Sequence, residues 1–146
     1  MKILLPDGAA PSGDPIFDIL TKCKTIAVVG LSSNPARPSY GVTEYMQSCG
    51  YQIIPVNPNE TDVLGEPSYA SLAEVPQKIE IVDVFRRAEE VPPVVDAAIS
   101  AGAKVIWMQL GIANEAAAEK ARAAGITVVM DACILAEHKK RRQKLT

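Results

Sequence analysis

Short apolar runs alternate with more polar segments along most of this chain. Five of the runs are rich in β-branched residues and lack a period-two alternation, which is typical of strands buried on both faces of a sheet. The predicted strands span residues 25–30, 51–56, 79–85, 103–110 and 126–130. The predicted helices span residues 14–22, 41–48, 89–100, 114–123 and 134–144.

Residues at the ends of these segments support the predicted boundaries. Asp14 can cap the first helix, and Pro15 suits its first turn. Gly50, Gly102 and Gly125 each lie between a helix and an apolar strand, where glycine readily adopts the left-handed conformation that ends a helix. Three such joins indicate repeated αβ units.

This alternation predicts the fold class. Strands joined by helices run parallel, with right-handed crossovers and helices on both faces of the sheet. We therefore expect an α/β, three-layer Rossmann-like fold with a five-stranded parallel sheet, in the order 3-2-1-4-5 along the chain numbering. Residues 1–13 are predicted to form a loose N-terminal arm, and residues 14–146 a single domain. Segment 59–78 is less regular, with a short edge piece at 63–65 and one helical turn at 71–74.

The loops after the strands are the expected binding region. In open α/β sheets, ligands lie beyond the carboxyl ends of the strands where the order reverses, here expected between the first and fourth strands. Cations stand in these loops at Arg37, Arg86 and Arg87, and the helix start near Gly41 adds free N–H groups. Together they predict an anion site, most simply for a phosphate or diphosphate.

Two common phosphate motifs are incomplete in this sequence. A dinucleotide fingerprint would place a second glycine two residues after Gly30, where the chain has Ser32. It would also place an acidic residue after the second strand, where the chain has Asn57. A P-loop needs a Gly-Lys pair, and the sequence has none.

Composition and charge narrow the class of protein. The 146 residues suit one domain, and a net charge of −2 gives no global field favouring nucleic acid or an anionic membrane. The apolar run at the N-terminus is too short for a signal peptide and no segment could span a bilayer, so a cytoplasmic protein is expected. Cys23, Cys49 and Cys133 are widely spaced, which supports neither a disulfide framework nor a zinc site.

Few residues outside the loops suggest chemistry. His138 is the only histidine and is expected on the surface of a basic terminal helix. The basic run 138–144 is expected on a solvated helix face rather than against nucleic acid, because cations suit the C-terminal end of a helix. Trp107 lies inside a predicted strand and is expected in the core. No metal site and no catalytic set is assigned.

The sequence resembles the CoA-binding domain family, whose members are relatives of the CoA-binding domain of the succinyl-CoA synthetase alpha subunit. The resemblance runs in order over about residues 15–142 and implies a Rossmann-like fold with coenzyme A as ligand. It rests on the segments IAVVGLSSNPARPSYGV (26–42), GYQIIPVNPN (50–59), LGEPSYASLAEVP (64–76), DVFRR (83–87), VIWMQLGI (105–112) and AGITVVMDACILAEH (124–138).

The resemblance also implies where each part of the ligand lies. The first loop is expected near the diphosphate, and Asn57 and Pro58 near the adenosine end. The loops after the third and fourth strands are expected to flank the adenine and the pantetheine arm. The candidate ligand-binding residues are Gly30, Ser32, Ser33, Asn34, Arg37, Ser39, Tyr40, Asn57, Pro58, Phe85, Arg86, Arg87, Gln109 and Gly111.

The expected function is non-catalytic binding of CoA or an acyl-CoA, and two alternatives stay open. One is an NAD(P)-binding oxidoreductase-like protein. The other is the CoA-binding subunit of an acyl-CoA ligase completed by a partner chain, because the synthetase reaction uses a phosphorylated histidine and a second domain that this chain lacks. A mixed disulfide between CoA and Cys133 is conceivable, but Asp131 nearby would raise the thiol pKa, so Cys133 is expected to be structural.

Overall fold

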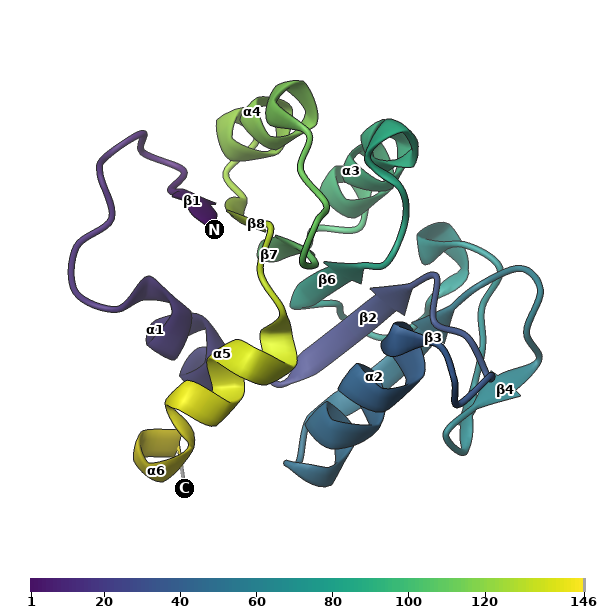
Figure 1. The fold of residues 1–146 in the computed structure, drawn as a ribbon. Coiled ribbons are helices and arrows are strands. Elements are labelled where there is room, and N and C mark those ends of the chain that lie inside the picture. Colours follow the sequence, from purple (N-terminus) through teal and green to yellow (C-terminus); the bar gives the residue numbers. More distant parts are fainter. Residues whose placement is uncertain (146) are drawn as a thin grey trace.

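A six-stranded sheet forms the centre of the protein in the computed structural model, which describes residues 1–145 (Figure 1). The strands, in their order across the sheet, are β1 (Lys2–Leu4), β8 (Thr127–Met130), β7 (Val105–Met108), β6 (Ile81–Val84), β2 (Thr25–Val29) and β3 (Gln52–Val56). The five predicted strands are all present and mutually parallel, whereas β1 pairs with β8 in the antiparallel direction.

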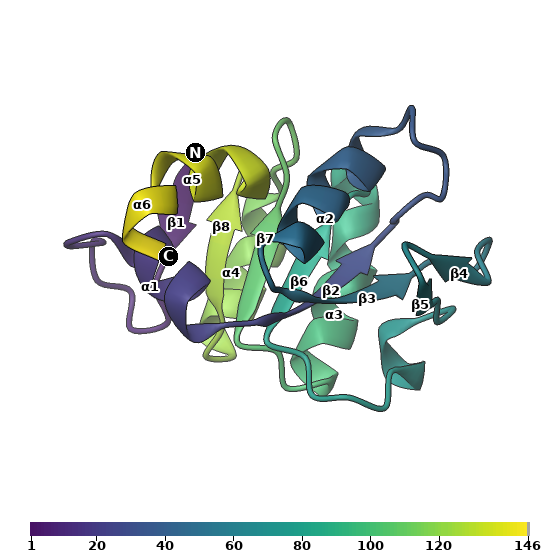
Figure 2. The same ribbon diagram turned by 90° about the horizontal axis from the view of Figure 1, so that it is seen from below.

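Helices cover both faces of the sheet, which confirms the predicted three-layer α/β fold (Figures 1 and 2). One face carries α3 (Val91–Ser100) and α4 (Glu115–Ala123). The other carries α1 (Pro15–Lys22), α2 (Pro38–Ser48), α5 (Ile134–Lys140) and α6 (Arg142–Leu145). No helix within residues 1–145 is long and apolar enough to cross a bilayer.

The strand order differs from the expected one. Counting only the five predicted strands, the order is 2-1-3-4-5 rather than 3-2-1-4-5, because β6 lies between β2 and β7. Val29 is in register with Val84, which in turn pairs with Met108. The order therefore reverses between β2 and β6, not between the first and fourth strands. All residues of β6 are buried, as in any central strand, and this pattern carries no information about which strands are its neighbours.

The N-terminal segment is only partly the loose arm that was expected. Lys2–Leu4 form β1, in which Ile3 is in register with Val129 of β8. Lys2 also reaches α4, where its Nζ lies 3.0 Å from Glu115 Oε2. The prediction was wrong for these residues because Ile3 and Leu4 pack against the two core clusters on either side of the sheet.

The irregular segment after β3 holds the small elements that were expected there. A two-stranded hairpin is formed by β4 (Asp62–Val63) and β5 (Glu66–Pro67), and η1 (Leu72–Glu74) is a single 3₁₀ turn. A second 3₁₀ turn, η2 (Ala88–Glu90), leads into α3. No α-helix stands between β3 and β6, so loops, the hairpin and one 3₁₀ turn connect these two strands.

The predicted helix boundaries are largely confirmed. Asp14 Oδ1 accepts a hydrogen bond from Phe17 N at 3.2 Å, and Pro15 is the first residue of α1. Gly50, Gly102 and Gly125 all have positive φ, at 95°, 73° and 92°. Three boundaries differ. α2 begins earlier than predicted, at a proline that suits the first turn. α3 begins two residues later than predicted, after η2, and the terminal helix is divided into α5 and α6.

The expectation for Trp107 is confirmed and that for His138 is wrong. Trp107 is fully buried, and its Nε1 donates to Ala132 O at 2.8 Å. His138 is only 5% exposed, because α5 packs across α2. Its Nδ1 lies 2.8 Å from Tyr45 Oη, and its ring stands edge-on to Tyr45 and Tyr51. Burial lowers the pKa of His138.

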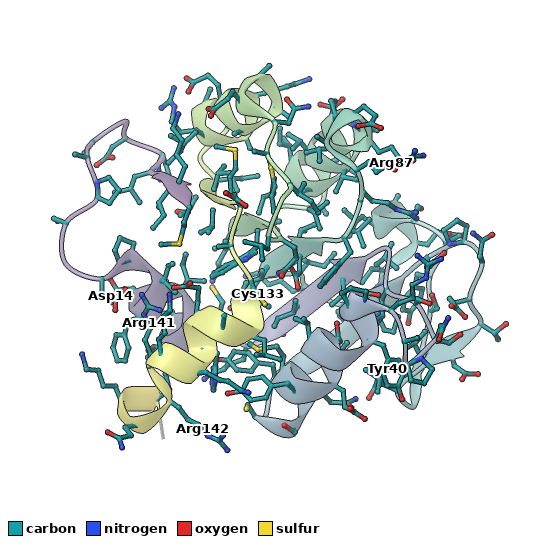
Figure 3. All side chains as sticks on the ribbon, in the orientation of Figure 1. Asp14, Tyr40, Arg87, Cys133, Arg141 and Arg142 are labelled. Atoms are coloured by element: carbon teal, nitrogen blue, oxygen red, sulfur yellow. The ribbon has the colours of Figure 1, made fainter. Side chains whose placement is uncertain are left out.

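The basic run 138–144 is mostly solvated as expected, with residues 139, 140 and 142–144 exposed, and the exceptions are His138, which is buried, and Arg141. Arg141 is half-buried and makes a two-pronged ion pair with Asp14, with Nε–Oδ2 and Nη2–Oδ1 distances of 2.8 and 3.0 Å (Figure 3). The Arg141 guanidinium lowers the pKa of Asp14. Asp14 therefore caps α1 and ties its start to the C-terminal end of α5.

Candidate functional site

A cleft of about 1030 Å³ lies at the carboxyl ends of the parallel strands. Its walls come from the loops after β2, β3, β6 and β7 and from the start of α5. The candidate residues that line it are Gly30, Ser32, Arg37, Ser39, Asn57, Phe85, Arg86, Arg87, Gln109 and Gly111. The topology brings these residues together because all five strand ends point to the same edge of the sheet.

Four candidate residues lie outside this lining. Ser33 and Asn34 are exposed in the same loop as Ser32. Pro58 lines an adjoining pocket, and Tyr40 is half-buried against the core cluster under α2 (Figure 3). Tyr40 therefore packs against apolar side chains and does not line the cleft.

Gly30 makes the floor of the cleft where the strand order reverses. Its φ is +89°, a conformation that L side chains rarely adopt. A Cβ at this position would overlap the carbonyl oxygen of Phe85. The backbones meet closely here, because Gly30 N donates to Val56 O and Phe85 N donates to Val29 O, both at 2.9 Å. Only glycine allows this approach.

The first loop, residues 31–37, is held by hydrogen bonds to its own backbone N–H groups. Ser32 N donates to Ser39 Oγ at 3.1 Å, and Asn34 N donates to Ser32 Oγ at 3.0 Å. Two further amides, those of Ala36 and Arg37, donate to the side chain and the carbonyl of Asn34. The loop is thus a preformed turn, in which serine and asparagine side chains replace regular secondary structure.

Asn57 joins the second loop to the first. Its Nδ2 donates to Leu31 O and its Oδ1 accepts from Asn59 N, both at 3.0 Å. The residue is 9% exposed, so its amide serves mainly to hold the two loops together. An acidic side chain here could not donate to Leu31, which gives a structural reason for asparagine at this position.

Of the three arginines that line the cleft, two have no ionic partner among residues 1–145. Arg37 stands exposed at the start of α2, and Arg86 is half-buried after β6. Arg87 instead lies 3.7 and 3.6 Å from the carboxylates of Glu89 and Glu90, both in the next turn (Figure 3). Arg37 and Arg86 are therefore the cations most available to an anionic ligand.

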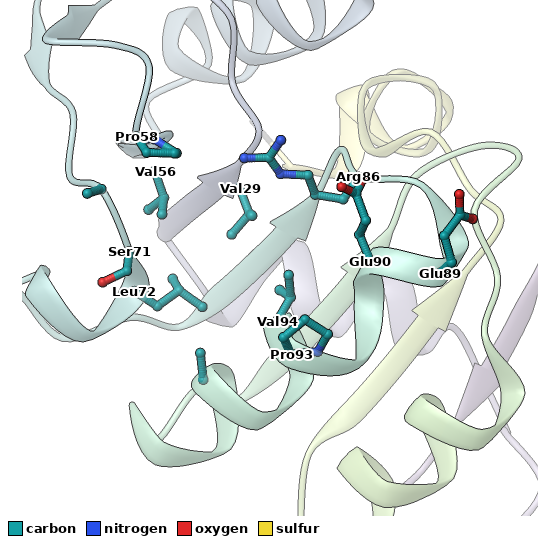
Figure 4. Close-up of a pocket in the computed structure, with 12 residues that line it drawn as sticks. Val29, Val56, Pro58, Ser71, Leu72, Arg86, Glu89, Glu90, Pro93 and Val94 are labelled. Carbon is teal, nitrogen blue, oxygen red and sulfur yellow. The ribbon is translucent and has the colours of Figure 1, made fainter.

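An apolar pocket of about 470 Å³ adjoins the cleft (Figure 4). Its lining includes Val29 and Val56 at the ends of β2 and β3, Leu72 of η1 and Val94 of α3. Figure 4 shows the Arg86 side chain extending across the mouth of this pocket toward Pro58. An apolar pocket with a guanidinium at its mouth suits a flat ring that carries a nearby phosphate.

A buried polar pair lies beneath the other end of the cleft. Asp83 of β6 is 2% exposed, and Gln109 Nε2 donates a hydrogen bond to its Oδ1. Gln109 Oε1 in turn accepts from Ile134 N, the first residue of α5, at 3.3 Å. Burial raises the pKa of Asp83 to about 7, although the Gln109 hydrogen bond acts in the opposite direction.

The raised pKa of Asp83 predicts a pH-dependent stability. The ordinary pKa is 3.8, so between about pH 4 and 7 the folded state holds a proton that the unfolded state has lost. This group therefore makes the protein less stable as pH rises through that window. We expect the free energy of unfolding of Asp83→Asn, relative to wild type, to rise by about 2–3 kcal/mol between pH 5 and pH 8, measured by urea unfolding at both values. The difference between Asp83→Asn and wild type reports the titration of Asp83 alone, because His138 is present in both proteins and its effect cancels.

The same difference in free energy of unfolding between variant and wild type at pH 5 and at pH 8 would contradict this prediction. Asparagine keeps an oxygen that can accept from Gln109, so the brace between β6, β7 and α5 is retained. Any constant difference between the variant and wild type reports the added amide donors and not the titration.

Several cleft residues were not among the candidates. Glu60, Asn59, Leu110 and Ile112 line the cleft, and so does Cys133. Cys133 stands at the start of α5, as predicted, and is half-buried at the cleft wall. Leu110 is 72% exposed. The sequence does not indicate this exposure, because an apolar residue at position 110 is predicted to end a buried strand.

Asp131, which follows β8, stabilises the loop after β7 through a hydrogen bond. Gly111 N donates to Asp131 Oδ1 at 2.7 Å, and Asp131 itself has a φ of +55°. The N-terminal ammonium of Met1 lies 3.9 Å from Asp131 Oδ2. No group of three or more His, Cys, Asp or Glu side chains suited to a metal ion occurs within residues 1–145.

Comparison with known proteins agrees with this geometry. Residues 24–139 match the family model described as the CoA binding domain. The uncharacterized protein YneT of Bacillus subtilis is 45% identical over 128 residues, which cover 88% of this chain and 95% of that protein. The structure of a hypothetical protein from Pyrococcus horikoshii OT3 has a TM-score of 0.84 at 40% identity, covering 86% of this chain and 89% of that one.

A third similar structure belongs to a larger enzyme. It is the dinucleotide forming acetyl-coenzyme A synthetase 1 of Ca. Korarchaeum cryptofilum, in complex with phosphate and ADP. The TM-score is 0.66 at 25% identity, over 77% of this chain but only 26% of the synthetase chain. Most of that synthetase therefore has no counterpart here.

Proposed function

This chain belongs to the CoA-binding domain family, and from that premise we propose that it binds coenzyme A or an acyl-CoA in the cleft without catalysing a reaction. The observation that carries the proposal is the pairing of the cleft with two arginines that have no ionic partner within residues 1–145, Arg37 and Arg86. CoA carries a diphosphate and a 3′-phosphate, so it needs more than one cation.

The proposed placement follows the chemistry of the lining. The diphosphate lies at the first loop and the start of α2, within reach of Arg37. The adenine ring enters the apolar pocket beside Pro58, with Arg86 at its mouth. The pantetheine arm then crosses Gly30, where no side chain blocks it, and its thiol end points toward Gln109 and Cys133.

Two features disfavour the alternatives. A dinucleotide with free ribose hydroxyls would be helped by a carboxylate after β3, but Asn57 stands there and is already bonded to Leu31 and Asn59. The histidine chemistry of a complete ligase would need an accessible imidazole. His138 is buried against Tyr45 and Tyr51, so a role in acyl-CoA ligation requires a partner chain to supply that group.

Isothermal titration with CoA and with NAD tests the proposal. We expect CoA to bind at least about tenfold more tightly than NAD, because its additional phosphate meets a second arginine. Titration with dephospho-CoA identifies which arginine meets the 3′-phosphate: the affinity lost on mutating that arginine is smaller for dephospho-CoA. Equal or tighter binding of NAD would overturn the proposed function.

A further inference from the structure

One anion already contacts the first loop, and it belongs to the protein itself. Ser33 N donates to Glu60 Oε2 at 2.7 Å, a length typical of a charge-assisted hydrogen bond. Glu60 follows β3 in the second loop and lines the cleft. Its carboxylate therefore bridges the loops after β2 and β3, and the first of these loops also carries Arg37.

The Ser33 amide differs from the other amides of this loop. Those of Ser32, Asn34, Ala36 and Arg37 donate to partners within residues 32–39. Pro35 and Pro38 have no N–H group to offer. Among residues 32–37, Ser33 is thus the one whose amide donates to a side chain from another segment, and that side chain carries a negative charge.

We propose that Glu60 is a built-in competitor for the phosphate of the ligand and sets the affinity and anion selectivity of the cleft. The inference rests on the proposed function, because the competing group is the CoA diphosphate. A phosphate that takes the Ser33 amide must displace the carboxylate, and it approaches a like charge as it does so. A ligand with several negatively charged oxygens, such as a diphosphate, displaces the carboxylate more readily than a ligand with a single negative charge.

Two isosteric variants provide the test. Glu60→Gln keeps an oxygen that can accept from Ser33 but removes the charge. Glu89→Gln is the matched control, because Glu89 also lines the cleft but its carboxylate faces Arg87 and does not contact the first loop. Titrations of wild type and both variants use CoA, inorganic diphosphate and pantetheine, the last of which carries no phosphate.

Glu60→Gln should bind CoA and diphosphate about five- to tenfold more tightly than wild type, the scale of one partly screened like-charge contact. Glu89→Gln should change these affinities less, and pantetheine should bind all three proteins equally. Unchanged or weaker binding of CoA and diphosphate by Glu60→Gln would overturn the inference, because Glu60 would then only brace the loop.

Failure of the proposed function gives a different pattern. If wild type binds diphosphate but not CoA, the ligand assignment fails, and the diphosphate titrations alone decide whether Glu60 competes. If neither CoA nor diphosphate binds wild type or Glu60→Gln, both ideas are wrong. Thermal unfolding of each variant verifies that a loss of binding is not a loss of folded protein.

Discussion

Replacing Gly30 with alanine should lower the free energy of unfolding by about 3–5 kcal/mol. Two independent effects contribute. A φ of +89° is strained for any L side chain, and the new Cβ would overlap the Phe85 carbonyl oxygen. Because that oxygen belongs to the backbone at the end of β6, it cannot rotate away as a side chain could. The ends of β2 and β6 would have to separate, so ligand binding should be lost together with stability.

Gly41→Ala is the matched control for this experiment. Gly41 lies within α2, its φ is not positive, and a Cβ there meets nothing within 4 Å. Alanine at this position should stabilise the protein by about 0.5–1 kcal/mol, because glycine is a poor helix former. Urea unfolding of both variants measures the contrast. Equal stability of Gly30→Ala and wild type would mean that β2 and β6 do not approach as described.

The double variant Arg37→Ala/Arg86→Ala should weaken CoA binding by about 3–6 kcal/mol, or abolish measurable binding. Each arginine is expected to contribute about 1.5–3 kcal/mol, the range of a hydrogen bond to a charged group. The two contributions should add because the residues stand on separate loops, at the start of α2 and after β6. Titration of the single and double variants with CoA measures both the loss and its additivity.

Arg87→Ala serves as the control for charge removal. Its side chain is 78% exposed and already faces Glu89 and Glu90, so its loss should change CoA affinity by less than about 1 kcal/mol. An Arg37→Ala variant that keeps the wild-type affinity and fold would show that the first loop is not the phosphate cradle. The same result for Arg86→Ala would remove the adenosine placement.

Local sequence predicted the elements of this fold because each depends on interactions within a few residues. The five strands are runs such as residues 26–29 that are buried on both faces, and burial selects apolar side chains wherever the run lies in the sheet. Asp14 and Asn114 cap the helices that follow them, at hydrogen-bond distances of 3.2 and 3.1 Å. Such caps join residues only three positions apart, so the local sequence is sufficient to predict them.

Most of the candidate residues chosen from the sequence line the cleft, even though the expected strand order was wrong. Residues such as Asn57 and Gln109 follow parallel strands, and the ends of parallel strands meet at one edge in either order. The wrong order displaced only the reversal point, which lies between β2 and β6. That change explains why Gly30 contacts Phe85 and not the loop after β7.

By itself, then, the sequence determined the αβ repeat, the strand and helix ends and the polar rim, because these follow from local conformation and from which side chains avoid water. Tertiary structure decided the rest. The position of β6 beside β2, the burial of His138 against Tyr45 and Tyr51, and the Ser33–Glu60 bond each join residues far apart in the chain. Their partners are selected by packing and charge in three dimensions, and no spacing within one segment records that selection.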